Sequence, residues 1–177
     1  EASVRVTNLT GHKLPTGYPE GRRAWLQLTA RKRGGQIVWQ SGAYDPATGI
    51  LTEDGQLRLY HAEPGIWNRN GTSECDITDS QGSPAFHFVL NDCWRVDTRI
   101  PPAGFTGGTN LEVRPIGITY PETSPGSGEL VNWDDVTYTV ALPPGTSGPI
   151  EFEARLLYQV ASKEYVEFLR DQAVEGN

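Results

Sequence analysis

Alternation of apolar and polar residues is most regular near the end of the chain, between residues 150 and 160. Ile150, Phe152, Ala154, Leu156 and Tyr158 occupy every second position. Successive side chains of a β-strand point to opposite faces of the sheet, so a period of two predicts a half-buried strand. Shorter segments of the same kind occur at residues 3–9, 25–30, 36–41, 57–62, 85–90 and 136–142. Residues 111–120 resemble an edge strand, because Pro115 cannot donate a hydrogen bond to a central ladder.

Turn-forming residues separate these segments, and the chain contains 20 glycines and 13 prolines among its 177 residues. After the last strand, Ser162 is a helix N-cap, and the apolar spacing that follows it predicts a short helix at about residues 163–173. We therefore expect an all-β fold: one antiparallel β-sandwich domain spanning residues 1–177. It would have about eight or nine strands, an immunoglobulin-like or jelly-roll-like arrangement, and a short C-terminal helix.

The charge balance excludes one class of partner. With 22 acidic and 15 basic residues the net charge is −7, whereas nucleic-acid binding requires a basic face. No run of 18 apolar residues is present, so no membrane span is expected. The chain begins at Glu1 and contains no methionine, which predicts a processed or excised segment.

Two cysteines, Cys75 and Cys93, lie 18 positions apart. This spacing is not that of a CxxC redox or zinc motif. The pair is either a structural disulfide or two buried free thiols, and the disulfide is the favoured interpretation. A disulfide would place the chain outside the cytoplasm, in the periplasm, at the cell surface or in the medium.

The principal candidate site is the connection between the first two expected strands, which lies within the stretch from Val6 to Leu26. It is about three times longer than the usual connector of 2–5 residues. Its glycines can adopt positive φ, and its prolines fix φ and extend the residues before them. A loop of this composition is expected to be rigid, and it holds His12, one of three histidines in the chain.

Three histidines could form a copper or zinc site. The spacing of His12, His61 and His87 does not favour one, and histidines on strands are more often structural than metal-ligating. His61 and His87 are therefore weak metal candidates. Arg22 and Arg23 could bind a carboxylate or a haem propionate, or Arg23 could pair with an acidic residue inside the fold.

Loop carboxylates and loop aromatic residues leave a second possibility. The pairs Asp134–Asp135, Asp76/Asp79 and Asp45/Asp54 could contribute to a calcium site, although no EF-hand spacing is present. Trp67, Trp94, Trp133, Tyr44 and Tyr120 lie in or near expected loops, where they could stack on a sugar or cover the edges of the sheets.

Several blocks of sequence resemble a β-rich domain on the C-terminal side of bacterial multihaem c-type cytochromes. These blocks extend over most of the chain: Asn8-x-Thr10-Gly11-His12-Lys13-Leu14-Pro15-Thr16-Gly17-Tyr18-Pro19, Arg22-Arg23-Ala24-Trp25-Leu26, Ser41-Gly42, Phe86-His87-Phe88, Asp97-Thr98-Arg99-Ile100-Pro101-Pro102-x-Gly104-Phe105, Leu156-Leu157-Tyr158-Gln159 and Ser162-x-x-Tyr165-x-x-x-Leu169. The first block is the most specific of them.

The resemblance implies a non-catalytic extracytoplasmic module of an extracellular electron-transfer assembly, which serves as a scaffold, a haem shield or a subunit contact. Its partners would be a multihaem cytochrome domain or copies of itself. The chain has no CxxCH motif, because Asp76 follows Cys75 and Trp94 follows Cys93, so it cannot attach haem c covalently. His12 could instead contact or ligate haem c carried by a partner, supported by Lys13, Pro15, Arg22 and Arg23.

Two other functions remain open at this point. The first is a carbohydrate- or surface-binding β-sandwich that uses loop tryptophans and, in one version, calcium. The second is a small metal protein built on the histidines. Haem content, calcium-dependent glycan binding and metal analysis would distinguish the three functions.

Overall fold

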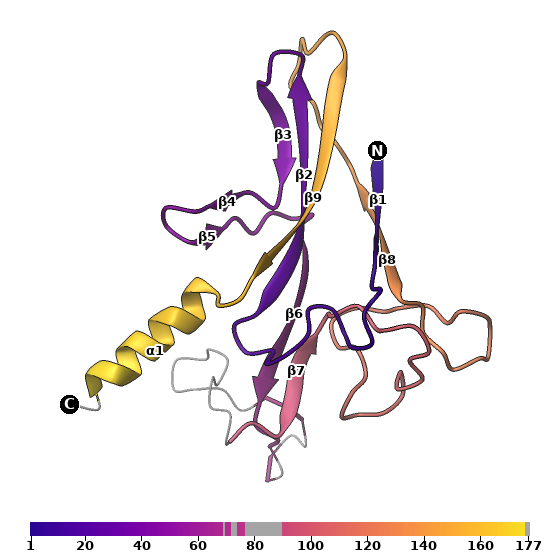
Figure 1. Ribbon diagram of the computed structural model, residues 1–177, viewed down its shortest axis with the longest axis vertical. Coiled ribbons are helices and arrows are strands. Elements are labelled where there is room, and N and C mark those ends of the chain that lie inside the picture. The colour runs from indigo at the N-terminus through magenta and orange to yellow at the C-terminus, as the bar shows by residue number, and fades with distance from the viewer. Residues whose placement is uncertain (69, 72–73, 77–89, 176–177) are drawn as a thin grey trace.

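Antiparallel β-strands form most of the regular secondary structure of the molecule (Figure 1). The computed structural model describes residues 1–68, 70–71, 74–76 and 90–175. Within these residues there are nine strands and one helix, and all strand pairs are antiparallel. The elements are β1 (Ala2–Thr7), β2 (Arg23–Lys32), β3 (Ile37–Ser41), β4 (Tyr44–Asp45), β5 (Ile50–Leu51), β6 (Arg58–Gly65), β7 (Cys93–Asp97), β8 (Trp133–Tyr138), β9 (Ile150–Gln159) and α1 (Lys163–Glu175). The predicted all-β class with a short C-terminal helix is thus confirmed.

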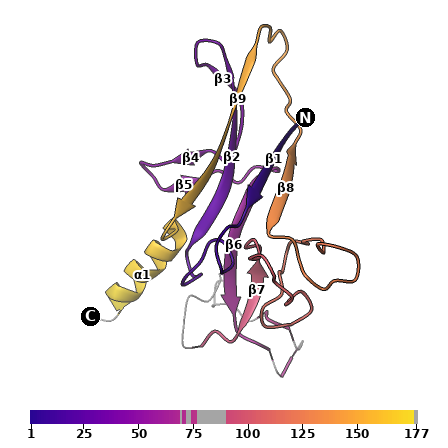
Figure 2. The same ribbon diagram turned by 45° about the vertical axis from the view of Figure 1, so that its right-hand side comes forward.

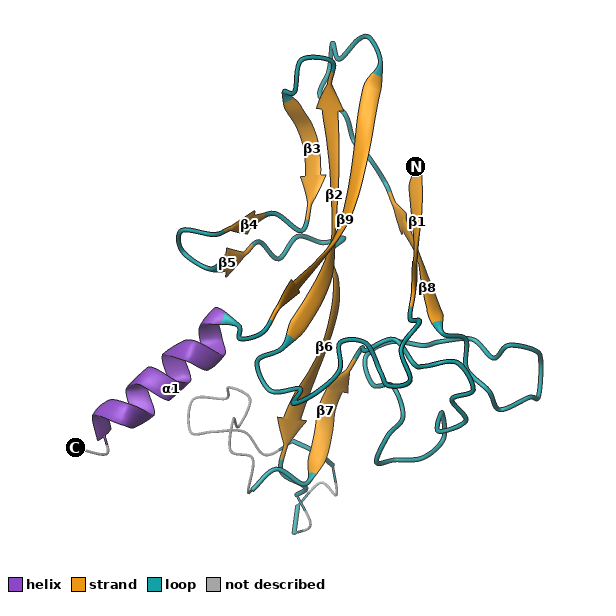
Figure 3. Ribbon diagram, in the orientation of Figure 1, coloured by secondary structure: helices purple, strands orange, loops and turns teal. Residues whose placement is uncertain are grey.

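Strand β2 is the centre of a five-stranded sheet. β9 pairs with it along its whole length on one edge, while β6 and β3 share the other edge, and β7 extends the sheet beyond β6. The long vertical ribbons of β2 and β9 show this arrangement (Figure 3). The burial pattern of β2 shows that both of its faces are covered, so it can carry apolar residues on each of them.

A second sheet of two strands, β1 and β8, covers one face of the first (Figure 2). Leu26 and Tyr60 of the larger sheet belong to one buried cluster with Val6, Val136 and Tyr138 of the smaller one. Burying side chains of this size contributes about 1.5–3 kcal/mol each. The core therefore lies between the two sheets and brings β1, near the start of the chain, together with β8, which is about 130 residues later.

The hairpin of β4 and β5 lies against the other face of β2. The rings of Tyr44 and Trp25 are 5.3 Å apart, and Nε1 of Trp25 donates a hydrogen bond to the carbonyl of Gly42 at 3.1 Å. Gly42 has φ of 70°, and a Cβ atom there would lie 2.8 Å from the carbonyl oxygen of Leu26. Only glycine fits this close approach.

The helix α1 follows β9 and begins at its predicted cap. The amide of Tyr165 donates to Oγ of Ser162 at 3.3 Å, and the amide of Ser162 itself donates to the carbonyl of Gly21 at 2.7 Å. The start of the helix is thereby fixed to the loop that precedes β2. Within the described residues, no helix combines the length and the apolar character that crossing a membrane requires.

One expected strand is wrong. Residues 111–120 form turns, with a single bridge between Asp97 and Ile116. The amides of Val113 and Arg114 both donate to the carbonyl of Asn110, and the amide of Glu112 donates to its side chain. Asn110 thus bends the chain where apolar alternation predicted extension. The strand expected at 85–90 falls almost wholly outside the described residues.

Two adjacent aspartates of β8 have very different surroundings. Asp134 receives two hydrogen bonds from Arg58, at 2.5 and 2.9 Å, and one from the hydroxyl of Tyr60 at 2.8 Å. Its side chain is 8% exposed, whereas that of Asp135, which pairs with Arg5, is 56% exposed. The ion pair of Asp134 therefore joins the two sheets inside the core, and that of Asp135 lies on the surface.

Replacing Asp134 by alanine should lower the free energy of unfolding by about 3 kcal/mol, because it leaves Arg58 and the buried hydroxyl of Tyr60 without their acceptor. Asp135→Ala is the matched control and should change stability little, since exposed ion pairs contribute little. Urea denaturation of both variants measures the difference. Equal losses for the two variants would contradict a special role for the buried pair.

Candidate functional site

The loop between β1 and β2 is fixed by the side chain of Asn8, which is fully buried. Its Nδ2 group donates to the carbonyls of His12, Ile100 and Pro101 at 2.7, 2.9 and 3.1 Å. Its Oδ1 atom accepts bonds from the amide and the hydroxyl of Thr10 at 2.9 and 2.8 Å. One side chain therefore shapes the turn at residues 10–12 and ties it to residues 100–101.

Further contacts hold the rest of the loop. Leu14 and Ile100 exchange backbone hydrogen bonds of 2.9 and 3.0 Å. The guanidinium of Arg22 donates to the carbonyl of Thr16 at 2.9 Å. Gly17 has φ of 88°, and a Cβ atom there would overlap the Arg22 side chain. The loop that was expected to be rigid is therefore anchored at both ends and in its middle.

A buried carboxylate, Asp97, joins this loop to strand β7. Arg99 donates to both of its oxygens at 2.8 Å, and Nζ of Lys13 donates to Oδ2 at 2.6 Å. The side chain of Asp97 is 0% exposed. Bidentate Arg–carboxylate pairs have a well-defined geometry, so this trio fixes the position of Lys13 relative to β7.

The charges within the trio favour the ionised form of the Asp97 carboxyl over its protonated form. Burial would raise the pKa of Asp97, but the hydrogen bonds and charges of Arg99 and Lys13 outweigh it and hold that pKa below its usual value. Burial lowers the pKa of Lys13 despite its bond to Asp97, and the charge of Arg99 adds to the effect. Each cation also lies over an aromatic ring, Lys13 over Phe105 and Arg99 over Trp94, both at 5.4 Å.

These groups line a pocket of about 470 Å³, which we call the His12 pocket. Its lining residues come from three segments: Gly11, His12, Lys13, Thr16 and Gly17; Trp94, Asp97, Arg99, Pro102 and Phe105; and Glu112 and Val113. Its volume is within the range of small-molecule sites. His12 is exposed, and no hydrogen bond or ion pair of its imidazole occurs among the described residues. The imidazole is therefore open to an external partner.

The other predicted site residues lie elsewhere. Pro15 is buried in the loop, and Arg22 supports the loop without lining the pocket. Arg23 is buried on β2, where it donates to Gln159 at 2.8 Å and lies 3.5 Å from Glu164 of the helix. His61 lies on β6, within 3.1 Å of Glu63 and 3.2 Å of Thr98. His87 falls outside the described residues.

Metal-ligand geometry is not found in the described part of the chain, where no group of three or more His, Cys, Asp or Glu residues could hold an ion. Two of the carboxylates considered for calcium, Asp45 and Asp54, have protein partners. Asp45 is bonded to Ala47 and Thr48, and Asp54 to Ser41 and Gly42. Asp79 lies outside the described residues.

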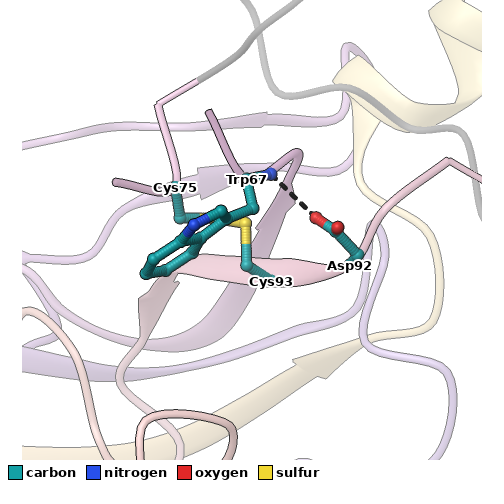
Figure 4. The surroundings of a disulfide bond; sticks show 4 residues. All are labelled: Trp67, Cys75, Asp92 and Cys93. Carbon is teal, nitrogen blue, oxygen red and sulfur yellow. Dashed lines mark hydrogen bonds between the residues drawn. A yellow bond between two sulfur atoms is a disulfide. The ribbon is translucent and has the colours of Figure 1, made fainter. Parts of the chain in front are cut away.

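The two cysteines form a disulfide at the start of β7 (Figure 4), which confirms the favoured interpretation. Their Cα atoms are 5.9 Å apart. Nearby, the amide of Trp67 donates to Asp92 at 2.7 Å. Cys93 is the first residue of β7 and Asp97 is its last. The disulfide therefore anchors the strand that supplies Trp94 and Asp97 to the His12 pocket. A disulfide is typical of oxidising compartments.

Sequence reasoning identified Lys13 and His12 but did not assign Asp97, Arg99, Trp94 and Phe105 to the site. Part of the signal was available, since the spacing Asp97-x-Arg99 places both side chains on one face of an extended segment. The pairing of Lys13 with Asp97, 84 positions away, depends on the tertiary fold.

The structure thus defines an all-β protein with a loop-built pocket. No protein-family model matches the chain, and neither the curated proteins nor the solved structures contain a significant match.

Asp97→Asn should lower the free energy of unfolding by about 3 kcal/mol near neutral pH, because two cations lose a buried counter-charge. The folded-state pKa of Asp97 lies below its ordinary value of 3.8. Its contribution is therefore complete above that pH and is lost as pH falls through the folded-state pKa. Urea denaturation of both proteins between pH 7 and 2 should show the difference shrink below pH 3.8. A difference independent of pH would contradict this assignment.

Removing the disulfide with the double substitution Cys75→Ser and Cys93→Ser should lower the free energy of unfolding by about 3 kcal/mol, since the unfolded chain gains loop entropy. Denaturation of the wild type with and without reductant gives the same comparison. Identical unfolding midpoints in the two conditions would contradict a stabilising role.

Proposed function

We propose that this chain is a non-catalytic extracytoplasmic module that docks onto a multihaem c-type cytochrome through the His12 pocket. It would act as a subunit contact or haem shield in an extracellular electron-transfer assembly. In fold type, we propose that its two sheets form a β-sandwich of the immunoglobulin-like or jelly-roll-like kind.

One observation carries this proposal. Two blocks that give the chain its resemblance to the cytochrome-associated domain lie far apart in sequence, at residues 8–19 and 97–105. Nine of the twelve residues that line the His12 pocket belong to these two blocks, five to the first and four to the second. Two of the blocks that carry the resemblance thus line one pocket together, as expected for a shared docking role rather than for packing alone.

The chemistry of the pocket suits a haem edge. Histidine is a common axial ligand of haem iron, and the exposed side chain of His12 lines the pocket. The rings of Trp94 and Phe105 supply flat apolar surface. The buried trio of Lys13, Asp97 and Arg99 carries one net positive charge, and the exposed carboxylate of Glu112, which also lines the pocket, balances it.

The disulfide supports the proposed compartment, because such bonds persist where the environment is oxidising. The resemblance on which the proposal rests implies an extracytoplasmic assembly, which is the same kind of compartment.

A c-type haem peptide with one open axial position tests the proposal. Adding the wild-type chain should shift its visible spectrum from high-spin to low-spin iron, with an affinity about tenfold or more above that of N-acetylhistidine, since the pocket adds contacts. His12→Ala should abolish the shift. The matched control His61→Ala should preserve it, because His61 is half-buried beside Glu63 and Thr98.

An unchanged titration with His12→Ala would exclude ligation by this residue. An affinity equal to that of N-acetylhistidine would exclude a contribution of the pocket.

A further inference from the structure

One edge of strand β9 has no partner strand in the described part of the chain. Its ten residues pair with β2 in an unbroken register from Arg23–Gln159 to Lys32–Ile150. Among the described residues, no strand and no backbone hydrogen bond occupies its opposite edge. This edge lies on the side of the sheet away from β6 and β7, and therefore away from the strand that lines the His12 pocket.

The side of β9 that continues the core is also uncovered. Residues directly opposite one another in an antiparallel pair lie on the same face. Ala30, Leu26 and Ala24 are almost fully buried, yet their β9 partners Phe152, Leu156 and Tyr158 are 51%, 44% and 52% exposed.

The covering sheet explains this contrast. Residues of β1 and β8 pack with residues of β2 and β6 in the buried core cluster, and among the described residues no side chain of β9 belongs to that cluster. The exposed side chains of β9 on this face form an apolar stripe of Phe152, Ala154, Leu156 and Tyr158, which Val160 continues. The stripe lies on the same face of the sheet as the core but is exposed to solvent.

Several features that normally prevent edge pairing are missing from β9, although its other face carries the charged residues Glu151, Glu153 and Arg155. Natural edge strands are short, contain bulges or proline, or point a charge inward. β3 and β7 have five residues each, and the ladders that join them to the sheet contain register shifts. β9 has ten residues, no proline, no register shift and no charged residue in its stripe. Such an edge is suited to pairing with another strand.

The charges of β9 favour a second copy of the same strand as that partner. If a two-fold axis perpendicular to the sheet passes through Ala154, both stripes stay on one face. Glu153 of each copy then lies opposite Arg155 of the other, and Phe152 lies opposite Leu156. A register centred on Arg155 would oppose two like charges, which is destabilising. A register centred on Leu156 would place Glu153 opposite Gln159 and form no ion pair.

We propose that the chain forms a symmetric dimer by antiparallel pairing of β9 with β9 of a second copy, with Ala154 on the two-fold axis. The two five-stranded sheets then become one continuous sheet, and the stripes of both copies form one apolar surface. The His12 pockets remain at the far sides of the dimer. This inference does not depend on what binds in them.

Sedimentation equilibrium of the purified chain should show a dimer. Glu153→Arg should weaken dimerisation by roughly tenfold or more, because two opposite-charge pairs become like-charge pairs, and Arg155→Glu should do the same. The double variant Glu153→Arg/Arg155→Glu should restore the affinity. Glu151→Arg is the matched control, since residue 151 lies opposite Leu157 in this register and should leave the dimer unchanged.

A cross-linking experiment tests the register itself. Both native cysteines are in the disulfide, so an introduced cysteine is the only free thiol. Ala154→Cys should form a covalent dimer on mild oxidation, because the residue faces itself across the axis. Leu156→Cys, which is opposite Phe152, should stay monomeric under denaturing conditions.

Two results would overturn the proposal. The first is a wild-type chain that remains monomeric up to about millimolar concentration, with native circular dichroism showing that it is folded. The second is cross-linking at residue 156 in preference to residue 154.

Discussion

Strand β2 is buried on both faces and paired on both edges, and the rest of the structure depends on this constraint. Leu26 and Leu28 lie in the core beneath β1 and β8, while Trp25 on the other face is covered by the β4–β5 hairpin. Three strands, β3, β6 and β9, have β2 as a direct partner. Since an unpaired strand with two apolar faces is unstable in water, these neighbours and β2 must form together.

Local pattern was sufficient to predict much of this fold. The regular alternation at residues 150–160 and the capped helix after Ser162 agree closely with β9 and α1, because both depend on near-neighbour periodicity. Pattern failed at residues 111–120, where the side chain and carbonyl of Asn110 bind the following amides. It also missed β4 and β5, whose two-residue strands are too short to show a period.

The candidate site was less predictable, since its geometry depends on contacts between distant segments. Glycine and proline content identified the loop of His12, but the role of Asn8 was not visible, because its three acceptors include carbonyls more than ninety positions away. The same holds for Asp97, whose cations come from its own segment and from residue 13. Backbone preferences depend on residues that are neighbours in the sequence, whereas the partners of a buried charge are set by the tertiary fold.

The strand pairs that close the core also have a consequence for the synthesis of the protein. Ser3 of β1 bonds to Thr137, 134 positions later, and Arg23 of β2 bonds to Gln159, 136 positions later. A chain that emerges from its N-terminus, from a ribosome or through a translocation pore, exposes β1 long before β8 exists, and it exposes one edge of β2 long before β9 exists. Contacts of such separation form slowly, and a free apolar β2 is prone to aggregate in the meantime. A holding chaperone that releases the chain only after β9 has emerged would suit this order of assembly.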